Sequence, residues 1–371
     1  MTPTTDWMRL TNPDETLSPS LLIFPDRVAE NLRRMIALAG GVERLRPHVK
    51  THKLPQIVAL KLAHGIRKFK TSTIAESEMC AVAGAPDVML AYQPVGPNVR
   101  RIIELVRKFP GTRFSCIADN LATVSALSSA AVAAGVTLDV WIDLNVGMNR
   151  TGIVPGPEAF AVYRAIAQAP GLRPAGLHVY DGHLIAQDKD QRRRDSVAAT
   201  APAFRLRDEL LAAGLPVPAI VGGGTPTLAI HAQNAGVELG AGTTVLWDVS
   251  DAEKSPHYDF LHAAVLFMRV ISHPAPNHIC IDLGHKSVAS ERPHPRVKLF
   301  GIDDAEFVNH SEEHLVVKTA RAAEFPVGTP VYGIPFHICP TVALQSEVYA
   351  VRDGRVFGTW PVVARARRLT V

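Results

Sequence analysis

The chain has 371 residues, of which 47% are hydrophobic and 20% charged, so it can bury a large core and form one large domain plus a smaller one. Its net charge of +4 arises from 39 basic and 35 acidic residues spread along the chain, which argues against a nucleic-acid or anionic-membrane partner. Four widely spaced cysteines, no signal-peptide pattern and no apolar run of membrane-spanning length favour a soluble protein in a reducing, cytoplasmic setting.

Short β-branched segments alternate with Ala- and Leu-rich segments in the first two thirds of the chain. The pattern predicts strands at 45–50, 69–75, 88–93, 113–119, 138–147, 175–183, 218–225 and 237–244. It predicts helices between them, at 54–65, 76–85, 99–109, 121–135, 159–169 and 201–214. Parallel strands that alternate with helices in this way indicate an α/β fold, a (β/α)₈ TIM-type barrel, and an open doubly wound sheet is the alternative.

The pattern changes at about residue 260, where strand-like runs are separated by Pro/Gly turns and helical periodicity is weak. The runs lie at 263–273, 278–284, 314–320, 330–334 and 346–365. A further short strand at 18–25 fits either domain. We therefore expect a barrel domain at 25–250 and a mainly β domain formed by 1–24 and 251–371.

Two glycine-rich strings follow the seventh and eighth predicted strands, where barrels commonly hold phosphate. They are GGGTPT at 222–227 and GAGTT at 240–244, and glycines let backbone N–H groups close on an anion. The candidate phosphate contacts are Gly222, Gly223, Gly224, Thr225, Gly242 and Thr243. The plainer alternative is two tight turns between strand and helix.

The sequence contains no P-loop string and no dinucleotide-binding glycine fingerprint, so a nucleotide is not the expected ligand of this phosphate site. Pyridoxal phosphate fits better, since it is phosphorylated and bonds to a lysine. Lys50 stands at the end of the first predicted strand, in RPHVKTHK. A lysine at that position can reach across the barrel to the phosphate site.

The string RPHVKTHK resembles the cofactor-lysine motif of the fold-type III pyridoxal-phosphate enzymes of the D-threonine aldolase and D-serine dehydratase group, which share a barrel with alanine racemase. The resemblance continues through TIAESEMCAVAGAPDVMLAYQPVG, DLNVGMNRTGI, YDGH, GGGTPT, SEEH and HICPTVAL. It therefore covers most of the chain, from about residue 18 to residue 344. The sequence departs from the pattern at ELGAGTTVLWD, where relatives more often have Arg-Pro-Gly.

The resemblance gives roles to the residues that match these motifs. Lys50 becomes the Schiff-base lysine and Lys53 a flanking residue, a choice that periodicity alone leaves open. Arg150 in GMNRTG is expected beside the cofactor ring and its phenolic oxygen, and Tyr180 in HVYDGH matches an active-site tyrosine. His183 is a candidate general base. Without the resemblance, each of the last three reads as an ordinary core or loop residue.

Two groups of residues keep open roles. His48 and His52 either lie near the cofactor or pack and cap the end of the first strand. The string NHSEEH, at 309–314, is dense in ionisable groups and is typical of a solvated turn. The resemblance also allows one of its last three residues to contribute to the mouth of the active site.

His337 and Cys339, in FHICPTV, form a candidate metal-binding pair. A His-x-Cys pair can present two ligands together only if the strand bends or ends there, as Pro340 indicates. The residues alone favour a half-buried histidine beside a small apolar cysteine. The resemblance implies a divalent-metal pair instead, with zinc favoured over manganese because Cys339 is the softer ligand.

We therefore expect a lyase that depends on pyridoxal phosphate and a divalent metal and acts on D-3-hydroxy amino acids. The favoured reaction is retro-aldol cleavage of a D-threonine-like substrate to glycine and an aldehyde. Dehydration of D-serine or D-3-hydroxyaspartate to an oxo acid and ammonia is the alternative, and Cys339 argues for it. An amino-acid racemase and a non-catalytic cofactor-binding protein are lesser options, and a homodimer is expected from two-domain relatives.

Overall fold

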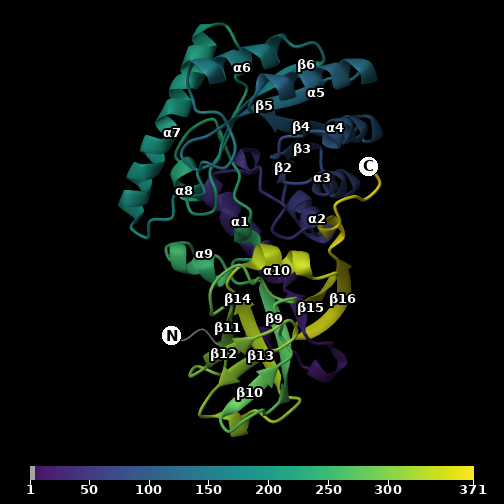
Figure 1. Cartoon of the computed structure of the whole chain (residues 1–371), viewed down its shortest axis with the longest axis vertical. Helices are drawn as coiled ribbons and strands as arrows, with labels where there is room; N and C mark the ends of the chain where they lie inside the picture. Colours follow the sequence, from purple (N-terminus) through teal and green to yellow (C-terminus); the bar gives the residue numbers. More distant parts are fainter. Residues whose placement is uncertain (1–4) are drawn as a thin grey trace. The chain divides into compact units, whose positions relative to one another are not determined.

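The computed structural model describes residues 5–371 and divides the chain into two compact units (Figure 1). The β unit contains the N-terminal residues up to Leu32 together with Thr51–Leu54 and Thr243–Arg365. The barrel unit contains Arg33–Lys50, Pro55–Gly242 and Ala366–Val371. None of the helices in the described part of the chain is long and apolar enough to cross a bilayer.

The two units differ from the expected domain ranges in a few short segments. Helix α1 (Pro25–Ala39) starts in the β unit, where Arg27 Nε donates to the carbonyl of His262 at 2.6 Å. The last residues of the chain belong instead to the barrel unit, where the N–H of Thr370 donates to Glu78 at 3.1 Å.

The barrel unit has seven regular parallel strands that follow one another in chain order. They are β2 (Lys68–Thr71), β3 (Asp87–Leu90), β4 (Arg113–Ala118), β5 (Leu138–Leu144), β6 (Leu172–Val179), β7 (Ile220–Gly222) and β8 (Val237–Leu239).

Residues 45–49 take the place of the eighth strand. Leu45 forms a parallel bridge with Leu239 in β8, and His48 forms one with Lys70 in β2. The segment thus lies between the first and last regular strands and closes the ring. Pro47 has no N–H to donate, which accounts for isolated bridges in place of a regular strand. The predicted (β/α)₈ barrel is confirmed.

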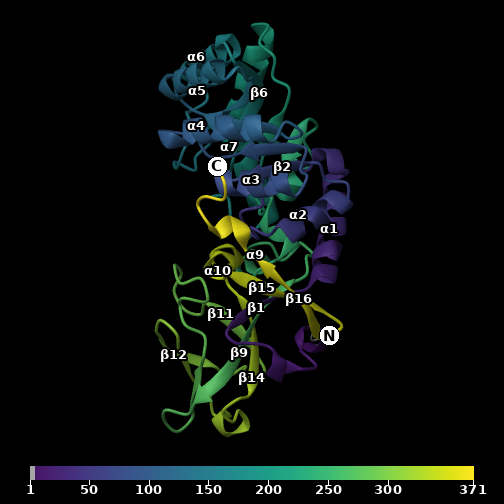
Figure 2. The same cartoon turned by 90° about the vertical axis from the view of Figure 1, so that its right-hand side faces the viewer.

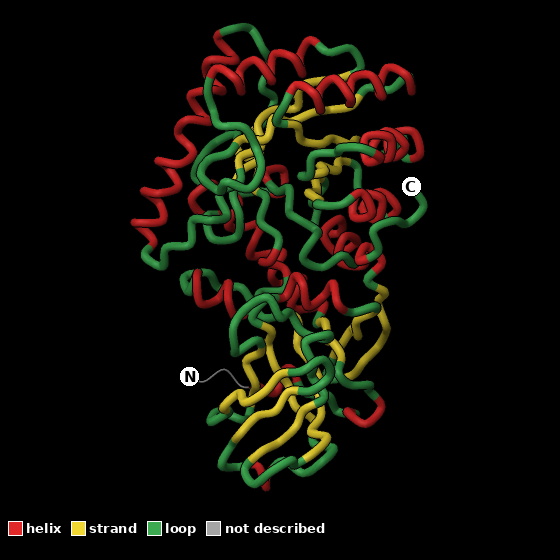
Figure 3. The backbone as a smooth tube through the Cα atoms, in the orientation of Figure 1, coloured by secondary structure: helices red, strands yellow, loops and turns green. Residues whose placement is uncertain are grey.

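Helices connect the strands and cover the outside of the barrel (Figure 3). After α1 they are α2 (Pro55–Ala63), α3 (Ile74–Val82), α4 (Pro97–Lys108), α5 (Leu121–Ala134), α6 (Pro157–Gln168), α7 (Lys189–Ala212) and α8 (Leu228–His231). Figure 2 shows α4, α5 and α6 next to one another, as their contacts require. Helix α7 begins earlier than predicted because Asp188 caps it by accepting the N–H of Gln191, and α1 was not predicted at all.

The β unit is built on an antiparallel sheet with the order β12-β13-β10-β9-β1-β15-β16, in which only β1 and β15 are parallel, and β14 joins β9 to β11. Its strands are β1 (Ser20–Ile23), β9 (Ala264–Ser272), β10 (His278–Ile281), β11 (Val297–Phe300), β12 (Glu306–His310), β13 (Leu315–Lys318), β14 (Pro330–Pro335), β15 (Glu347–Arg352) and β16 (Arg355–Pro361). The unit also contains the short helices α9 (Val249–Lys254) and α10 (Ile338–Leu344). Leu22, Val265, Phe267 and Ile334 form part of its core, so the strand predicted at 18–25 belongs here.

Candidate active site

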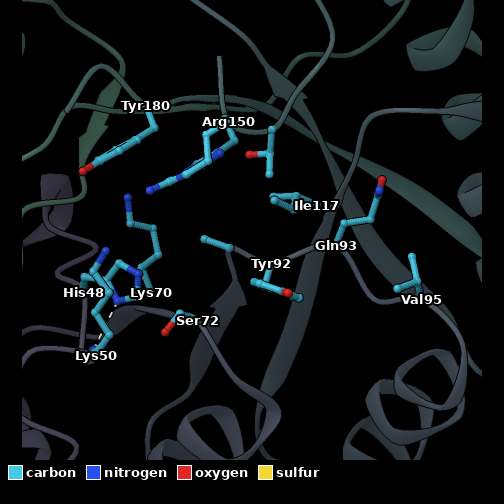
Figure 4. A pocket seen from close by; sticks show the side chains of 13 residues that line it. His48, Lys50, Lys70, Ser72, Tyr92, Gln93, Val95, Ile117, Arg150 and Tyr180 are labelled. Atoms are coloured by element: carbon cyan, nitrogen blue, oxygen red, sulfur yellow. Dashed lines mark hydrogen bonds between the residues drawn. The ribbon is translucent and has the colours of Figure 1, made fainter. Parts of the chain in front are cut away.

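A cavity of about 580 Å³ opens at the C-terminal ends of the barrel strands, a volume typical of sites for small ligands (Figure 4). Its wall comes from the closing segment, from β2, β4 and β6, and from residues that follow β2, β3, β5 and β6. The lining residues are His48, Lys50, Lys70, Ser72, Ala91, Tyr92, Gln93, Val95, Ile117, Arg150, Thr151, His178 and Tyr180. Three of the residues singled out from the sequence, Lys50, Arg150 and Tyr180, are therefore brought together.

The two lysines of RPHVKTHK have different surroundings. Lys50 lines the cavity. Lys53 belongs to the β unit, where its Nζ donates to the carbonyl of Ala364 at 3.3 Å. The structure thus distinguishes two residues that periodicity alone could not, and only Lys50 is available to a ligand in this cavity.

Positive charge gathers around the ring of Tyr180. Arg150 Cζ lies 5.0 Å from the ring centroid, Lys70 Nζ 5.7 Å and Lys50 Nζ 6.0 Å. No Asp or Glu is among the residues that line the cavity. Because cations held together at the wall of a cavity repel one another and lose solvation, this cluster favours an anionic ligand.

Two histidines in the wall are neutral. His48 is buried, and its Nδ1 accepts the N–H of Lys50 at 3.2 Å. Burial, together with the charges of Lys50 and Lys70, lowers the pKa of His48 well below its ordinary value. The proton of the neutral ring is then on Nε2.

The second histidine, His178, is paired with Asp143 through Nδ1 and Oδ1 at 2.7 Å, and both side chains are buried. Burial lowers the pKa of His178. Burial acts to raise the pKa of Asp143, but the bond from His178 and the charge of Arg150 outweigh it and hold that pKa below its ordinary value. An ionised Asp143 therefore fixes the proton of a neutral His178 on Nδ1, and Nε2 is buried without a hydrogen-bond partner among the described residues.

Lys70, His178 and Asp143 were not predicted as site residues from the sequence. Each lies within a predicted strand, in FKTST, LHVYD or WIDLN, among apolar neighbours. Charged residues that alternate with apolar ones in a strand normally face solvent. In a closed barrel the alternate face is the interior, so a charged residue near the C-terminal end of a strand was the available signal.

The glycine-rich loop after β7 rests on a buried carboxylate. The N–H of Gly224 donates to Thr227 Oγ1 at 3.2 Å, and that hydroxyl donates to Asp181 Oδ1 at 2.7 Å. Asp181 also accepts from Ser196 Oγ at 3.0 Å and is 2.7 Å from His231 Nε2. The bond from His231 is the largest influence that holds the pKa of Asp181 down against the effect of burial.

Not all the predicted phosphate contacts are free for a ligand. The N–H of Gly223 donates to the carbonyl of Val179 at 3.2 Å, so the N–H groups of Gly223 and Gly224 are both used within the protein. Thr243 belongs to the β unit, and its side chain hydrogen-bonds to Asp251. Gly222, Thr225 and Gly242 complete the predicted set, and none of the six lines the cavity.

His183 follows Tyr180 in the loop after β6 but does not line the cavity. A Cβ placed on Gly147 would lie 3.0 Å from its Nε2, so the imidazole packs against the loop after β5. Its Nδ1 is buried without a hydrogen-bond partner among the residues described. His52 is fully buried, and its Nδ1 accepts the N–H of Leu54, which matches the packing and capping alternative.

The candidate metal pair lies in the β unit, where β14 ends at Pro335 and α10 follows. His337 is the residue that precedes the helix, and Cys339 is in its first turn. His337 Nδ1 is hydrogen-bonded to Glu291, and Cys339 Sγ contacts Thr51 Oγ1 at 3.3 Å. Within residues 5–371, no group of three or more His, Cys, Asp or Glu side chains is arranged to hold a metal.

The string NHSEEH forms the end of β12 and the turn before β13. Lys286 Nζ lies 2.6 Å from Glu312 and 3.5 Å from Glu313, and all three side chains are exposed. This arrangement matches a solvated turn.

Comparison with known proteins identifies relatives along almost the whole chain. The family model for the N-terminal domain of alanine racemase matches residues 23–245, and a model for a serine dehydratase domain matches residues 263–351. The chain is 30% identical to a D-threonine aldolase of Arthrobacter sp over 94% of this chain and 92% of the relative. It is 28% identical to a D-threo-3-hydroxyaspartate dehydratase of Delftia sp. (strain HT23), over 92% and 96%.

A solved structure is similar over the same extent. The crystal structure of D-threonine aldolase from Filomicrobium marinum superposes with a TM-score of 0.88 at 28% identity, and it covers 96% of this chain and 98% of that one. The likeness thus includes the β unit as well as the barrel.

Proposed function

Because this chain belongs to the D-threonine aldolase and D-serine dehydratase-like family, whose barrel is that of alanine racemase, we propose that it is a pyridoxal-phosphate-dependent lyase that cleaves D-3-hydroxy amino acids. The favoured reaction is retro-aldol cleavage of a D-threonine-like substrate to glycine and an aldehyde. The observation that carries the proposal is the barrel-mouth cavity, in which Lys50, Lys70 and Arg150 surround Tyr180 and no carboxylate is present.

The lining residues fit this cofactor. Pyridoxal phosphate brings a phosphate and a phenolic oxygen, and the cations of the wall offset their negative charge. Lys50 would hold the cofactor through its ε-amine, and Arg150 also lies near the ring of Tyr180. When bound, pyridoxal phosphate supplies an electron sink for the bond that breaks at the Cα of the substrate.

The residue that removes a proton decides between the two reactions. If a base takes the proton of the hydroxyl on Cβ, the Cα–Cβ bond breaks, the aldehyde leaves and Cα gains a proton to give glycine. If Lys50 takes the proton on Cα instead, the hydroxyl on Cβ leaves as water, and hydrolysis of the resulting enamine by a second water gives the oxo acid and ammonia. We assign the first role to His183, as the resemblance implies, and because its side chain is not among the residues that line the cavity, it would act through water or after a movement of its loop.

The metal site is the second part of the proposal. His337 and Cys339 offer one nitrogen and one sulfur ligand, so water or substrate has to complete the coordination shell, as in catalytic sites with open positions. The bond between His337 Nδ1 and Glu291 supports this role, because a carboxylate commonly orients a metal-binding imidazole through its other nitrogen. A thiolate ligand favours zinc over manganese. Bound there, the ion supplies Lewis-acid chemistry toward a hydroxyl.

Dehydration is the second candidate function, and Cys339 favours it. The resemblance associates His-x-Cys with the dehydratases and His-x-Asp with many aldolases, and the dehydratase of Delftia sp. (strain HT23) is among the relatives. The higher identity of the D-threonine aldolase of Arthrobacter sp favours the aldolase. The homodimer and the cytoplasmic setting remain predictions from the sequence.

The test is a product assay on D-threonine and D-serine, with L-threonine as the stereochemical control. Zinc or manganese is added in parallel reactions, and a chelator is added in a third. Glycine together with acetaldehyde from D-threonine is the expected result. Oxo acid and ammonia as the main products would assign the chain to the dehydratases, and turnover of neither D-substrate would refute the proposal.

A further inference from the structure

Lys70 is a buried cation that faces the cavity. Its side chain comes from β2 and points toward Arg150 and Tyr180 (Figure 4). The residue is only 2% exposed, although it lines the cavity wall. Among the residues that the structure describes, its Nζ has no hydrogen-bond or ion-pair partner, so the ammonium is available to a ligand.

The carboxylates that act on Lys70 through space are engaged elsewhere. Asp143 and Asp181 are the acidic groups whose charge favours the protonated lysine. Asp143 is bonded to His178, while Asp181 is held by its own three donors, among them Ser196. Neither carboxylate therefore pairs with Nζ.

The protein itself offers little to offset the charge of Lys70. Burial is the main influence that lowers the pKa of Lys70 to about 7, and Lys50 adds to it. A buried ion without a partner destabilises the folded state even after its surroundings relax. A bound anion would offset much of that cost.

The ammonium of Lys70 lies close to a glycine that follows β8, the strand on the other side of the closing segment. Gly240 directly follows β8, at the start of the string GAGTT. A Cβ placed on Gly240 would collide with Lys70 Nζ. The backbone at Gly240 has no left-handed conformation that would itself require glycine. A side chain at this position would therefore have to displace the end of Lys70 and would also come within 3.3 Å of the carbonyl of Gly223.

We propose that Lys70 is a second cofactor-binding cation, which holds negative charge of pyridoxal phosphate in the cavity, and that a side chain at Gly240 would displace its ammonium from that position. The inference rests on the proposed function, because it assumes that this cavity binds the cofactor. It adds a residue that the motifs did not identify and ties it to the departure from the family pattern at ELGAGTT.

The test is a double-mutant cycle on cofactor affinity, measured by absorbance titration of the cofactor-free full-length protein with pyridoxal phosphate. Lys70→Ala should weaken binding about ten- to a hundredfold, the range of a charge-assisted hydrogen bond. Gly240→Ala should weaken it by a similar factor when Lys70 is present. In the Lys70→Ala background, Gly240→Ala should have almost no further effect, because the atom that it displaces is gone.

Two matched controls guard against general damage. Gly156 has ordinary extended backbone and no atom within 4 Å of a Cβ placed on it, so Gly156→Ala should leave cofactor affinity unchanged. Lys68, two residues earlier on β2, pairs with Glu238, so Lys68→Ala should also leave it unchanged. Thermal unfolding of every variant checks that the fold is retained.

Pyridoxal, which lacks the phosphate, identifies the group that Lys70 contacts. If Lys70→Ala weakens pyridoxal phosphate but not pyridoxal, the phosphate is the partner; if it weakens both, the partner is on the ring. Equal affinity of wild type and Lys70→Ala for both ligands would overturn the inference, as would full additivity with Gly240→Ala. Failure of the wild-type protein to bind pyridoxal phosphate would instead overturn the proposed function.

Discussion

Replacement of Lys61 by methionine should flatten the pH dependence of stability above neutral pH. Lys61 lies in α2 and is fully buried. Burial lowers the pKa of Lys61 to about 7 from an ordinary value of 10.5. Each pKa unit of this difference corresponds to about 1.36 kcal/mol. Burial of the protonated side chain therefore lowers the free energy of unfolding at low pH by at most roughly 5 kcal/mol.

The sign of the effect follows from proton binding. Below about pH 7 the lysine is protonated in both states, so folding has to bury its charge. As the pH rises further, the folded state releases the proton while the unfolded state keeps it until about pH 10.5, so the free energy of unfolding increases. The increase is at most about 1.4 kcal/mol per pH unit for one lysine.

The assay is urea unfolding of the cofactor-free protein at about pH 7.5 and about pH 9.5, followed by circular dichroism. Between these values, the wild-type protein should gain roughly 2 to 3 kcal/mol more than Lys61→Met. Lys189, which is exposed at the start of α7, provides the control, and Lys189→Met should keep the wild-type slope. Equal slopes for the wild type and Lys61→Met would refute the reasoning.

Three further predictions concern the residues beneath the site, and urea unfolding measures each. Gly223→Ala should lower the free energy of unfolding by about 2 to 4 kcal/mol, because φ is +77° and a Cβ would lie 2.8 Å from a buried histidine ring. Gly214→Ala, at φ +76° with no atom within 4 Å, should lower it by about 1 kcal/mol. Equal losses would contradict the steric argument. Asp181→Asn should lower the free energy of unfolding by about 2 to 4 kcal/mol, because it disturbs the hydrogen bonds with Ser196, Thr227 and His231. Ser196→Ala removes one of the three and should lower it by about 1 kcal/mol. A larger loss in Ser196→Ala than in Asp181→Asn would contradict this assignment. The free energy of unfolding should fall as the pH drops below about 6.5, because burial lowers the pKa of His178 and unfolding then takes up a proton. The fall should be smaller in His178→Gln. An equal fall in that variant would exclude His178 as a cause.

The fold was largely predictable because its signals are local. The strands of the barrel are short β-branched runs and the helices between them are Ala- and Leu-rich, so periodicity located most of them. Helix α1 was not predicted, because the segment at 18–25 was interpreted as a strand and the residues after it were not assigned. The early start of α7 depends on the cap at Asp188, which precedes a run of charged residues without apolar periodicity.

Site residues could be predicted only where they stand in a motif at the end of a predicted strand. Lys50 stands at a strand end in a recognisable motif, and the structure separates it from Lys53. Lys70 and His178 could not be found in the same way, because only closure of the barrel turns their faces inward. The contact between Lys70 and Gly240 joins residues far apart in sequence, and no local pattern reports it.

The most direct test of the central claim is to locate the lysine that carries the cofactor. The purified protein is loaded with pyridoxal phosphate, reduced with borohydride and digested, and the modified peptide is identified by mass spectrometry. The adduct is expected on Lys50 and should be lost in Lys50→Ala. An adduct on Lys53 or Lys70, or no adduct in a protein that retains its fold, would contradict it.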